Sequence, residues 1–153
     1  MVEHQTAVRW CPLADIPETP IEDFVLESSR AGQLRLVLRY SQIPVNPDRD
    51  LELMFSDALA LRMHWEGDAP LVGGRLVDPP RCGGKSSQFI WPLLIVKNSR
   101  WLVSGDFDTS NFIAEAMKTE PWQQFTFLTL ERSIDIIARG EVSANWIASP
   151  RSQ

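Results

Sequence analysis

The chain has 153 residues, of which 44% are hydrophobic and 23% are charged, so it suits one folded domain and is not typical of a disordered chain. Its net charge is −5 and it has no cluster of Lys and Arg residues, which argues against a nucleic-acid partner and against an anionic membrane surface. No apolar run approaches about 18 residues and no apolar signal segment opens the chain, so we expect a cytoplasmic protein and no membrane partner.

The N-terminal part carries signals for a helix. Residues 11–20 carry three prolines, and the N-terminal segment 1–18 is expected to be irregular. In residues 19–22 a threonine is followed by a proline and then by a glutamate, the order of an N-cap, a first helical residue and a capping-box acid. We therefore predict a short helix that starts there and ends near Gly32. An edge strand over residues 24–27 is the alternative.

Alternation of apolar and polar residues indicates strands in the next part of the chain. Residues 34–40 alternate except at Val37, and residues 51–65 place an apolar side chain at almost every odd position. The second stretch is longer than an ordinary strand of roughly 3–10 residues. We predict either two strands joined by a tight turn or one strand that bends at Ser56–Asp57. Trp65 at its end is expected to be buried.

A Gly- and Pro-rich loop over residues 67–87 follows. Residues 89–96 form an apolar run that is predicted to be a buried strand, with a bulge or an edge at Pro92. Asn98–Ser99 has the composition of a turn. Residues 101–104 are therefore expected to pair back as a hairpin.

The C-terminal part combines a helix with strands. Residues 108–119 begin with capping side chains and continue with apolar residues at helical spacing, which predicts a helix. Residues 125–130 alternate like a strand, whereas residues 133–138 fit either a strand or a helix that Gly140 closes. The polar tail from residue 149 is expected to fray.

Together these elements predict one α+β domain over residues 1–153. Short links between most neighbouring strands favour antiparallel pairing. We expect a curved antiparallel sheet, or a partly open barrel or sandwich, of about six to seven strands with one or two short helices at one face or end.

Two sequence motifs come close to cofactor sites but fail. Residues 84–86 read Gly-Lys-Ser, like the end of a phosphate-binding loop, but Pro79 stands at the first glycine of that motif and offers no backbone N–H. Residues 106–117 begin like a calcium loop, but Asn111 replaces its glycine and Met117 replaces its bidentate glutamate. We therefore predict no cofactor and no metal ion.

The two cysteines, Cys11 and Cys82, match no redox or metal motif. A disulfide between them is possible, but nothing in the sequence requires it. In the cytoplasm both thiols are expected to be reduced. Cys82 follows Arg81, and an exposed thiol beside a cation can be reactive. An ordinary loop thiol is the simpler interpretation.

The candidate binding residues are charged or aromatic side chains near the ends of predicted elements. One group lies on a single strand face and can bind an anion or exchange protons. Two aspartates precede the predicted C-terminal helix and can present carboxylates to a partner. Two of the six tryptophans are expected to be partly exposed, as interface anchors often are. The set is Arg62, His64, Glu66, Asp106, Asp108, Trp122 and Trp146.

No catalytic constellation is identified, so the leading hypothesis is a non-enzymatic binding or interaction module. An acidic β-rich domain could cap a basic partner protein, and a toxin-neutralising immunity protein is one version of this. Self-association into a homo-oligomer fits as well. The alternatives are a small-molecule-binding β domain with an aromatic concave face and a small enzyme that uses His64 and nearby carboxylates, which requires the fold to bring these groups together.

Overall fold

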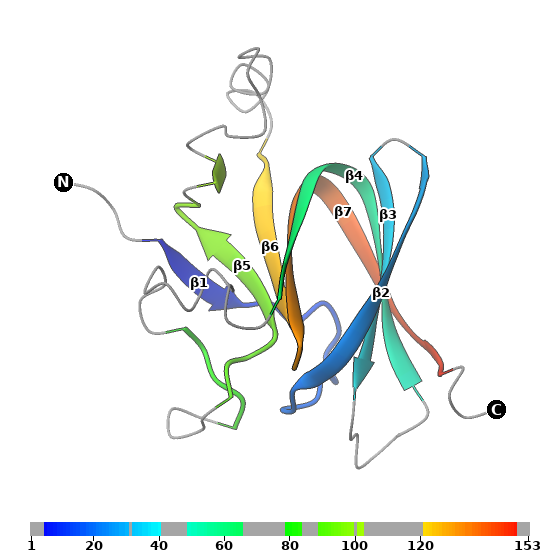
Figure 1. Ribbon diagram of the computed structural model, residues 1–153, viewed down its shortest axis with the longest axis vertical. Coiled ribbons are helices and arrows are strands. Elements are labelled where there is room, and N and C mark those ends of the chain that lie inside the picture. Colours follow the sequence, from blue (N-terminus) through cyan, green and yellow to red (C-terminus); the bar gives the residue numbers. More distant parts are fainter. Residues whose placement is uncertain are drawn as a thin grey trace.

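The computed structural model describes residues 5–30, 32–40, 49–65, 79–83, 89–99, 101–102 and 121–149. These residues form one seven-stranded sheet in which every pair of neighbours is antiparallel, in the order β1-β5-β6-β7-β4-β3-β2 (Figure 1). The predicted antiparallel sheet of six to seven strands is thereby confirmed. The strands are β1 (Thr6–Arg9), β2 (Ile21–Arg30), β3 (Gln33–Tyr40), β4 (Arg49–Trp65), β5 (Leu93–Lys97), β6 (Gln123–Leu128) and β7 (Arg132–Ala148).

Strands β4 and β7 form a long bent ribbon at the centre of the sheet. Each has 17 residues, and they pair from Arg49–Ala148 at one end to Trp65–Arg132 at the other. Irregular register near residues 55–60 of β4 marks the bend, and Gly140 in β7 has a φ of +77° that suits glycine. Figure 1 shows the ribbon as an arch. The single bent strand predicted as one of two possibilities for residues 51–65 is therefore confirmed.

The arch divides the sheet into two halves that share their core. Strands β2 and β3 extend the sheet from the first half of β4, and β6, β5 and β1 extend it from the first half of β7. Aromatic rings fill the space between the halves: Phe55 lies 5.4 Å from Phe125 and 6.2 Å from Phe127, measured between ring centroids. Trp10 packs edge-on against Phe125 at 5.0 Å. One core therefore holds both halves of the sheet together.

One corner of the bent sheet is closed by contacts between β2 and the turn that joins β6 to β7. The backbone N–H of Leu130 donates to the carbonyl of Ile21 at 3.0 Å. Arg132 lies 2.5 Å from a carboxylate oxygen of Asp23 and donates to the carbonyl of Phe24 at 3.1 Å. These contacts bring the outer edge of one half against the other half at this corner.

The helix predicted from Thr19 to near Gly32 is wrong, because these residues contain the edge strand β2. The alternative of a strand over residues 24–27 is confirmed. Phe24 lies in the core and pairs with Leu38 of β3, so cross-strand packing outweighs the local helix-start signals. Gly32, with a φ of +82°, serves the turn between β2 and β3 and does not end a helix.

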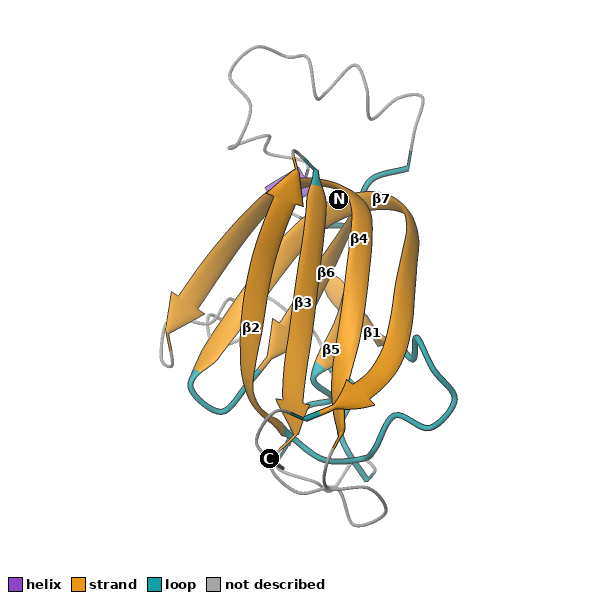
Figure 2. Cartoon of the chain, turned by 90° about the vertical axis from the view of Figure 1, so that its right-hand side faces the viewer, coloured by secondary structure: helices purple, strands orange, loops and turns teal. Residues whose placement is uncertain are grey.

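The α+β class is not supported, because the described residues contain no complete helix. Trp101 and Leu102 have helical conformation, shown in purple in Figure 2, so the hairpin predicted over residues 101–104 is wrong at these two positions. The helix predicted over residues 108–119 lies outside the described residues. What the structure does describe is a curved antiparallel sheet.

Several boundaries also differ from the predictions. Strand β1 lies inside the segment 1–18 that was expected to be irregular, and β5 starts at Leu93, after Pro92. Residues 133–138 form a strand that continues through Gly140 to Ala148, so the glycine bends the strand and does not end it. Ser149 is buried, and the loop 67–87 is described only at residues 79–83. The described residues include no helix that is long and apolar enough to cross a membrane.

Candidate functional site

The end of β4, residues 60–65, forms an open strand edge that we call the β4 edge segment. One side of it pairs with β7, from Ala60–Ile137 to Trp65–Arg132. On the other side, β3 stops pairing with β4 at Phe55, and the last bond in that direction runs from the N–H of Ala58 to the carbonyl of Gly32 at 2.6 Å. Among the described residues, no strand pairs with the second side of the β4 edge segment.

Apolar side chains on one face of the β4 edge segment are exposed although their neighbours on β7 are core residues. Leu61, Met63 and Trp65 are 46%, 43% and 59% exposed, whereas Ile134 and Ile136 on the same face of β7 are fully buried. The difference follows from position, because β7 has strands on both sides and the edge segment has one. The predicted burial of Trp65 is therefore wrong. Three alternate apolar side chains thus lie on the core side, and no further strand in the described part of the chain flanks them.

Arg132 contacts this apolar row from β7. Its guanidinium lies 5.7 Å from the Trp65 ring centroid and 4.2 Å from the Phe24 ring centroid, and Nη1 lies 3.6 Å from the Met63 sulfur. The same guanidinium binds Asp23, which lowers the pKa of that carboxyl even though burial acts to raise it. Arg132 is thus held by a charge partner while it supports two side chains of the exposed row.

The opposite face of the β4 edge segment carries Arg62 and His64, the two candidate residues that the structure brings together. Both approach the carboxylate of Asp135 on β7: Arg62 Nε lies 2.7 Å from Oδ2, and His64 Nε2 lies 3.4 Å from the same oxygen. Asp135 is fully buried. Its other oxygen accepts a hydrogen bond from Thr126 Oγ1 at 2.6 Å. The buried Asp135 carboxylate therefore pairs with a partly exposed arginine.

A chain of polar side chains extends from Asp135 across β6. Gln124 Nε2 donates to Thr126 Oγ1 at 3.0 Å, and Ser99 donates a short hydrogen bond to Gln124. The backbone N–H of Leu102 donates to Ser99 Oγ at 3.1 Å. The side chains of Ser99, Gln124 and Thr126 are all buried. Their hydrogen bonds to one another therefore satisfy polar groups that water does not reach.

The cluster around Asp135 is a network of ion pairs and hydrogen bonds among the described residues. His64 Nε2 is near Asp135 but makes no hydrogen bond there, and Ser133, its cross-strand neighbour, has a buried hydroxyl without a partner among the described residues. The Arg62 guanidinium stacks on the Trp101 ring at 4.2 Å. Glu66, Asp106 and Asp108 lie outside the described residues, so their distance from His64 stays untested.

The two candidate tryptophans contact other parts of the chain. Trp122 lies directly before β6, and the Arg139 guanidinium stands 4.4 Å from its ring. Trp146 lies in β7 beyond the bend, where its Nε1 donates to Asp15 at 2.9 Å and its ring lies 5.9 Å from Tyr40. Both side chains are half-buried. The fold thus places them apart from the β4 edge segment.

Sequence reasoning missed Asp135, Leu61 and Met63 as site residues. A signal for Asp135 existed, because an acid inside an apolar strand must find a partner when it is buried. Leu61 and Met63 gave no such signal, since alternation predicts that a side chain faces the core but does not tell whether another strand covers it.

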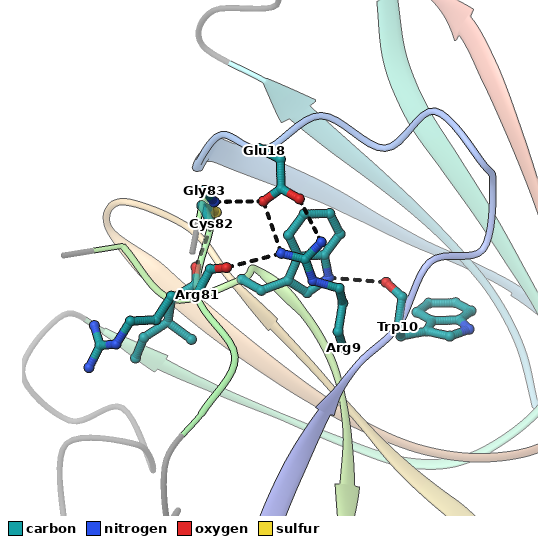
Figure 3. A network of polar contacts seen from close by, with 8 residues as sticks. Arg9, Trp10, Glu18, Arg81, Cys82 and Gly83 are labelled. Atoms are coloured by element: carbon teal, nitrogen blue, oxygen red, sulfur yellow. Dashed lines mark hydrogen bonds and ion pairs between the residues drawn. The ribbon is translucent and has the colours of Figure 1, made fainter. Parts of the chain in front are cut away.

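Cys82 is buried in a clamp between the N-terminal segment and the loop before β5 (Figure 3). Arg9 forms two bonds to the Glu18 carboxylate, at 2.6 and 2.9 Å, and the N–H of Gly83 donates to Glu18 at 2.8 Å. Arg9 also covers the Trp91 ring at 3.9 Å. Cys82 is buried, so the exposed thiol considered from the sequence is not found at this position, and burial raises the pKa of this thiol. Cys11 and Cys82 are both unpaired thiols.

The described residues contain no group of three His, Cys, Asp or Glu side chains arranged to hold a metal ion. Comparison with models of known protein families, with curated proteins and with solved structures gave no match to this chain.

Proposed function

We propose that this protein is a non-enzymatic interaction module that binds an extended segment of another polypeptide along the β4 edge segment. The observation that carries this proposal is the apolar row of Leu61, Met63 and Trp65, which is exposed on an edge that no strand of the described residues pairs with. A strand added there would form backbone hydrogen bonds and would bury the row, a known mode of peptide recognition. Each apolar side chain that becomes fully buried contributes about 1.5–3 kcal/mol.

The charges near the edge support this proposal. Sheet edges are commonly protected from pairing by charged side chains, above all by lysine, or by proline. Residues 60–65 contain no proline and no lysine, and their one permanent charge, on Arg62, is compensated by Asp135. The edge therefore carries weak electrostatic protection while it exposes three apolar side chains.

The preference for a basic partner rests on the charge of the whole chain. Its net charge of −5 favours approach of a positively charged protein. The described acids Glu18, Asp23, Asp57 and Asp135 are each paired with an arginine. A basic partner is therefore expected to be attracted over distance, while the β4 edge segment supplies the short-range contacts. Complex stability should then fall as salt rises.

A pull-down from the native host tests the proposal with a matched pair of variants. Met63→Lys places a charge in the apolar row, whereas Met54→Lys places the same charge on the same strand, where β4 has neighbours on both sides. The two methionines are similarly exposed, at 43% and 39%. We expect Met63→Lys to reduce the amount of any bound protein identified by mass spectrometry at least tenfold, and Met54→Lys to leave that amount unchanged. Equal retention by both variants would refute binding at this edge.

A further inference from the structure

We infer that a second copy of this chain can occupy the β4 edge segment, with the two segments paired antiparallel about a two-fold axis. This inference rests on the proposed function only for strand addition at this edge, because a second copy carries the same net charge of −5 and is a different occupant from the basic partner. A two-fold interface uses the same residues from both copies, so it requires an edge that is complementary to itself.

The alternation of side chains makes the β4 edge segment complementary to itself. If the axis passes at Met63, then Met63 faces its counterpart, and Leu61 of one copy faces Trp65 of the other. All of these side chains lie on the same face, because residues 61, 63 and 65 differ by even numbers. The apolar row of one copy would then continue the apolar row of the other, and both would be covered.

The charges on the opposite face select this register. With the axis at Met63, Arg62 of one copy faces His64 of the other. With the axis one residue earlier, Arg62 faces its own counterpart at about 5 Å, and like charges directly opposite destabilise a strand pair. The favoured register therefore keeps the two Arg62 side chains from standing directly opposite each other.

The small size of the interface sets its strength. Five paired residues, 61–65, extend over about 17 Å at the rise of a β-strand, which is short for an interface. Stable complexes usually bury about 1,200–2,000 Å² in total. We therefore expect a weak, concentration-dependent dimer with a dissociation constant on the order of 10 µM or above, and not a permanent one.

Sedimentation velocity over a range of concentrations tests for the dimer. The wild-type chain should shift from monomer to dimer as its concentration rises from about 1 to 500 µM, a span that brackets the expected constant. Met63→Lys should stay monomeric, and Met54→Lys should dimerise like the wild type. Circular dichroism of each variant would establish that it is folded. If Met63→Lys does not fold, Leu61→Lys takes its place in the experiment.

Cysteine cross-linking tests the register. In a Cys11→Ser background, Met63→Cys alone should form a disulfide-linked dimer under mild oxidation. A mixture of Leu61→Cys and Trp65→Cys should cross-link at least fivefold more than either variant alone, because these positions face each other only across the axis. Met54→Cys is the control and should not cross-link above background. Buried Cys82 remains in all samples and contributes equally.

The outcomes separate the inference from the proposed function. A monomer at every concentration overturns the second copy as occupant, while loss of a different protein in the Met63→Lys pull-down would still support strand addition. A dimer that Met63→Lys leaves intact overturns the inference, because the copies then meet elsewhere. A dimer that Met63→Lys abolishes, with cross-links at the expected pairs, supports both.

Discussion

Asp135 shows how one buried carboxylate can organise a polar face of the sheet. It is fully buried and contacts Arg62, His64 and Thr126, which come from two different strands. A charge at such a depth is stable only when it is paired and hydrogen-bonded. Arg62 is partly exposed and can turn toward water if Asp135 is lost, whereas loss of Arg62 would leave the buried carboxylate without its charge partner, so the pair is costlier to break by removing the arginine.

We expect Asp135→Asn to lower the free energy of unfolding by about 1.5–3 kcal/mol, the usual value of hydrogen bonds to charged groups. The carboxamide keeps the volume but removes the charge that pairs with Arg62. Asp57→Asn is the matched control, since Asp57 pairs with Arg139 at the surface and is 43% exposed. Surface pairs contribute about 0–1 kcal/mol. Urea denaturation of the two variants measures the difference, and equal losses would contradict a special role for Asp135.

The two thiols should differ in reactivity because their surroundings differ. Cys11 is exposed, whereas Cys82 is buried and its pKa is raised by that burial, so little thiolate forms near neutral pH. A colorimetric thiol reagent at pH 8 should label one thiol per chain rapidly and the second only after denaturation. Cys11→Ser should abolish the rapid phase. Rapid labelling that persists in this variant would show that Cys82 is accessible.

Among the elements, the bend of β7 depends on one glycine. Gly140 has a φ of +77°, where a side chain causes strain, although a Cβ there would meet nothing closer than Ser56 Oγ at 3.6 Å. The cost of Gly140→Ala is therefore conformational, about 1–2 kcal/mol. Gly140→Asn should cost less, because asparagine tolerates this region better. Thermal unfolding of both variants checks the order, and a larger loss for asparagine would contradict it.

At the same scale, the sequence predicted strands better than it predicted helices. Alternation located β3, β4 and β6 because one wet face and one buried face impose a period of two. The helix expected from Thr19 failed because its start signals are local, whereas the core contact of Phe24 and the pairing with β3 are not. The open edge of the candidate site was not predictable, since no residue pattern states where the neighbouring strand stops.

For the whole molecule, Arg132 controls the closed corner between the two halves of the sheet. It binds Asp23 and the carbonyl of Phe24, next to the bond from the Leu130 N–H to the Ile21 carbonyl. Arg132→Ala should therefore free the start of β2 and raise the hydrogen-exchange rate of the Leu130 amide about tenfold or more, since one bond to a charged group is worth about 1.5–3 kcal/mol.

Arg139→Ala is the control for this prediction. Arg139 also combines an acidic partner with an aromatic ring, but its partners, Asp57 and Trp122, are not those of the closed corner. It should leave exchange at Leu130 unchanged. If both variants accelerate exchange equally, the corner opens with general destabilisation and not through Arg132.

The arch of β4 and β7 also has a kinetic consequence. Its pairs join residues as distant in the chain as Arg49 and Ala148, and each half of the sheet contains part of both strands. Loops of this length must close, at a cost in chain entropy, before the paired strands form stabilising contacts. A high contact order and slow folding follow. Neither half can reach its final shape before the last strand is synthesised, and the two should therefore form in one cooperative step.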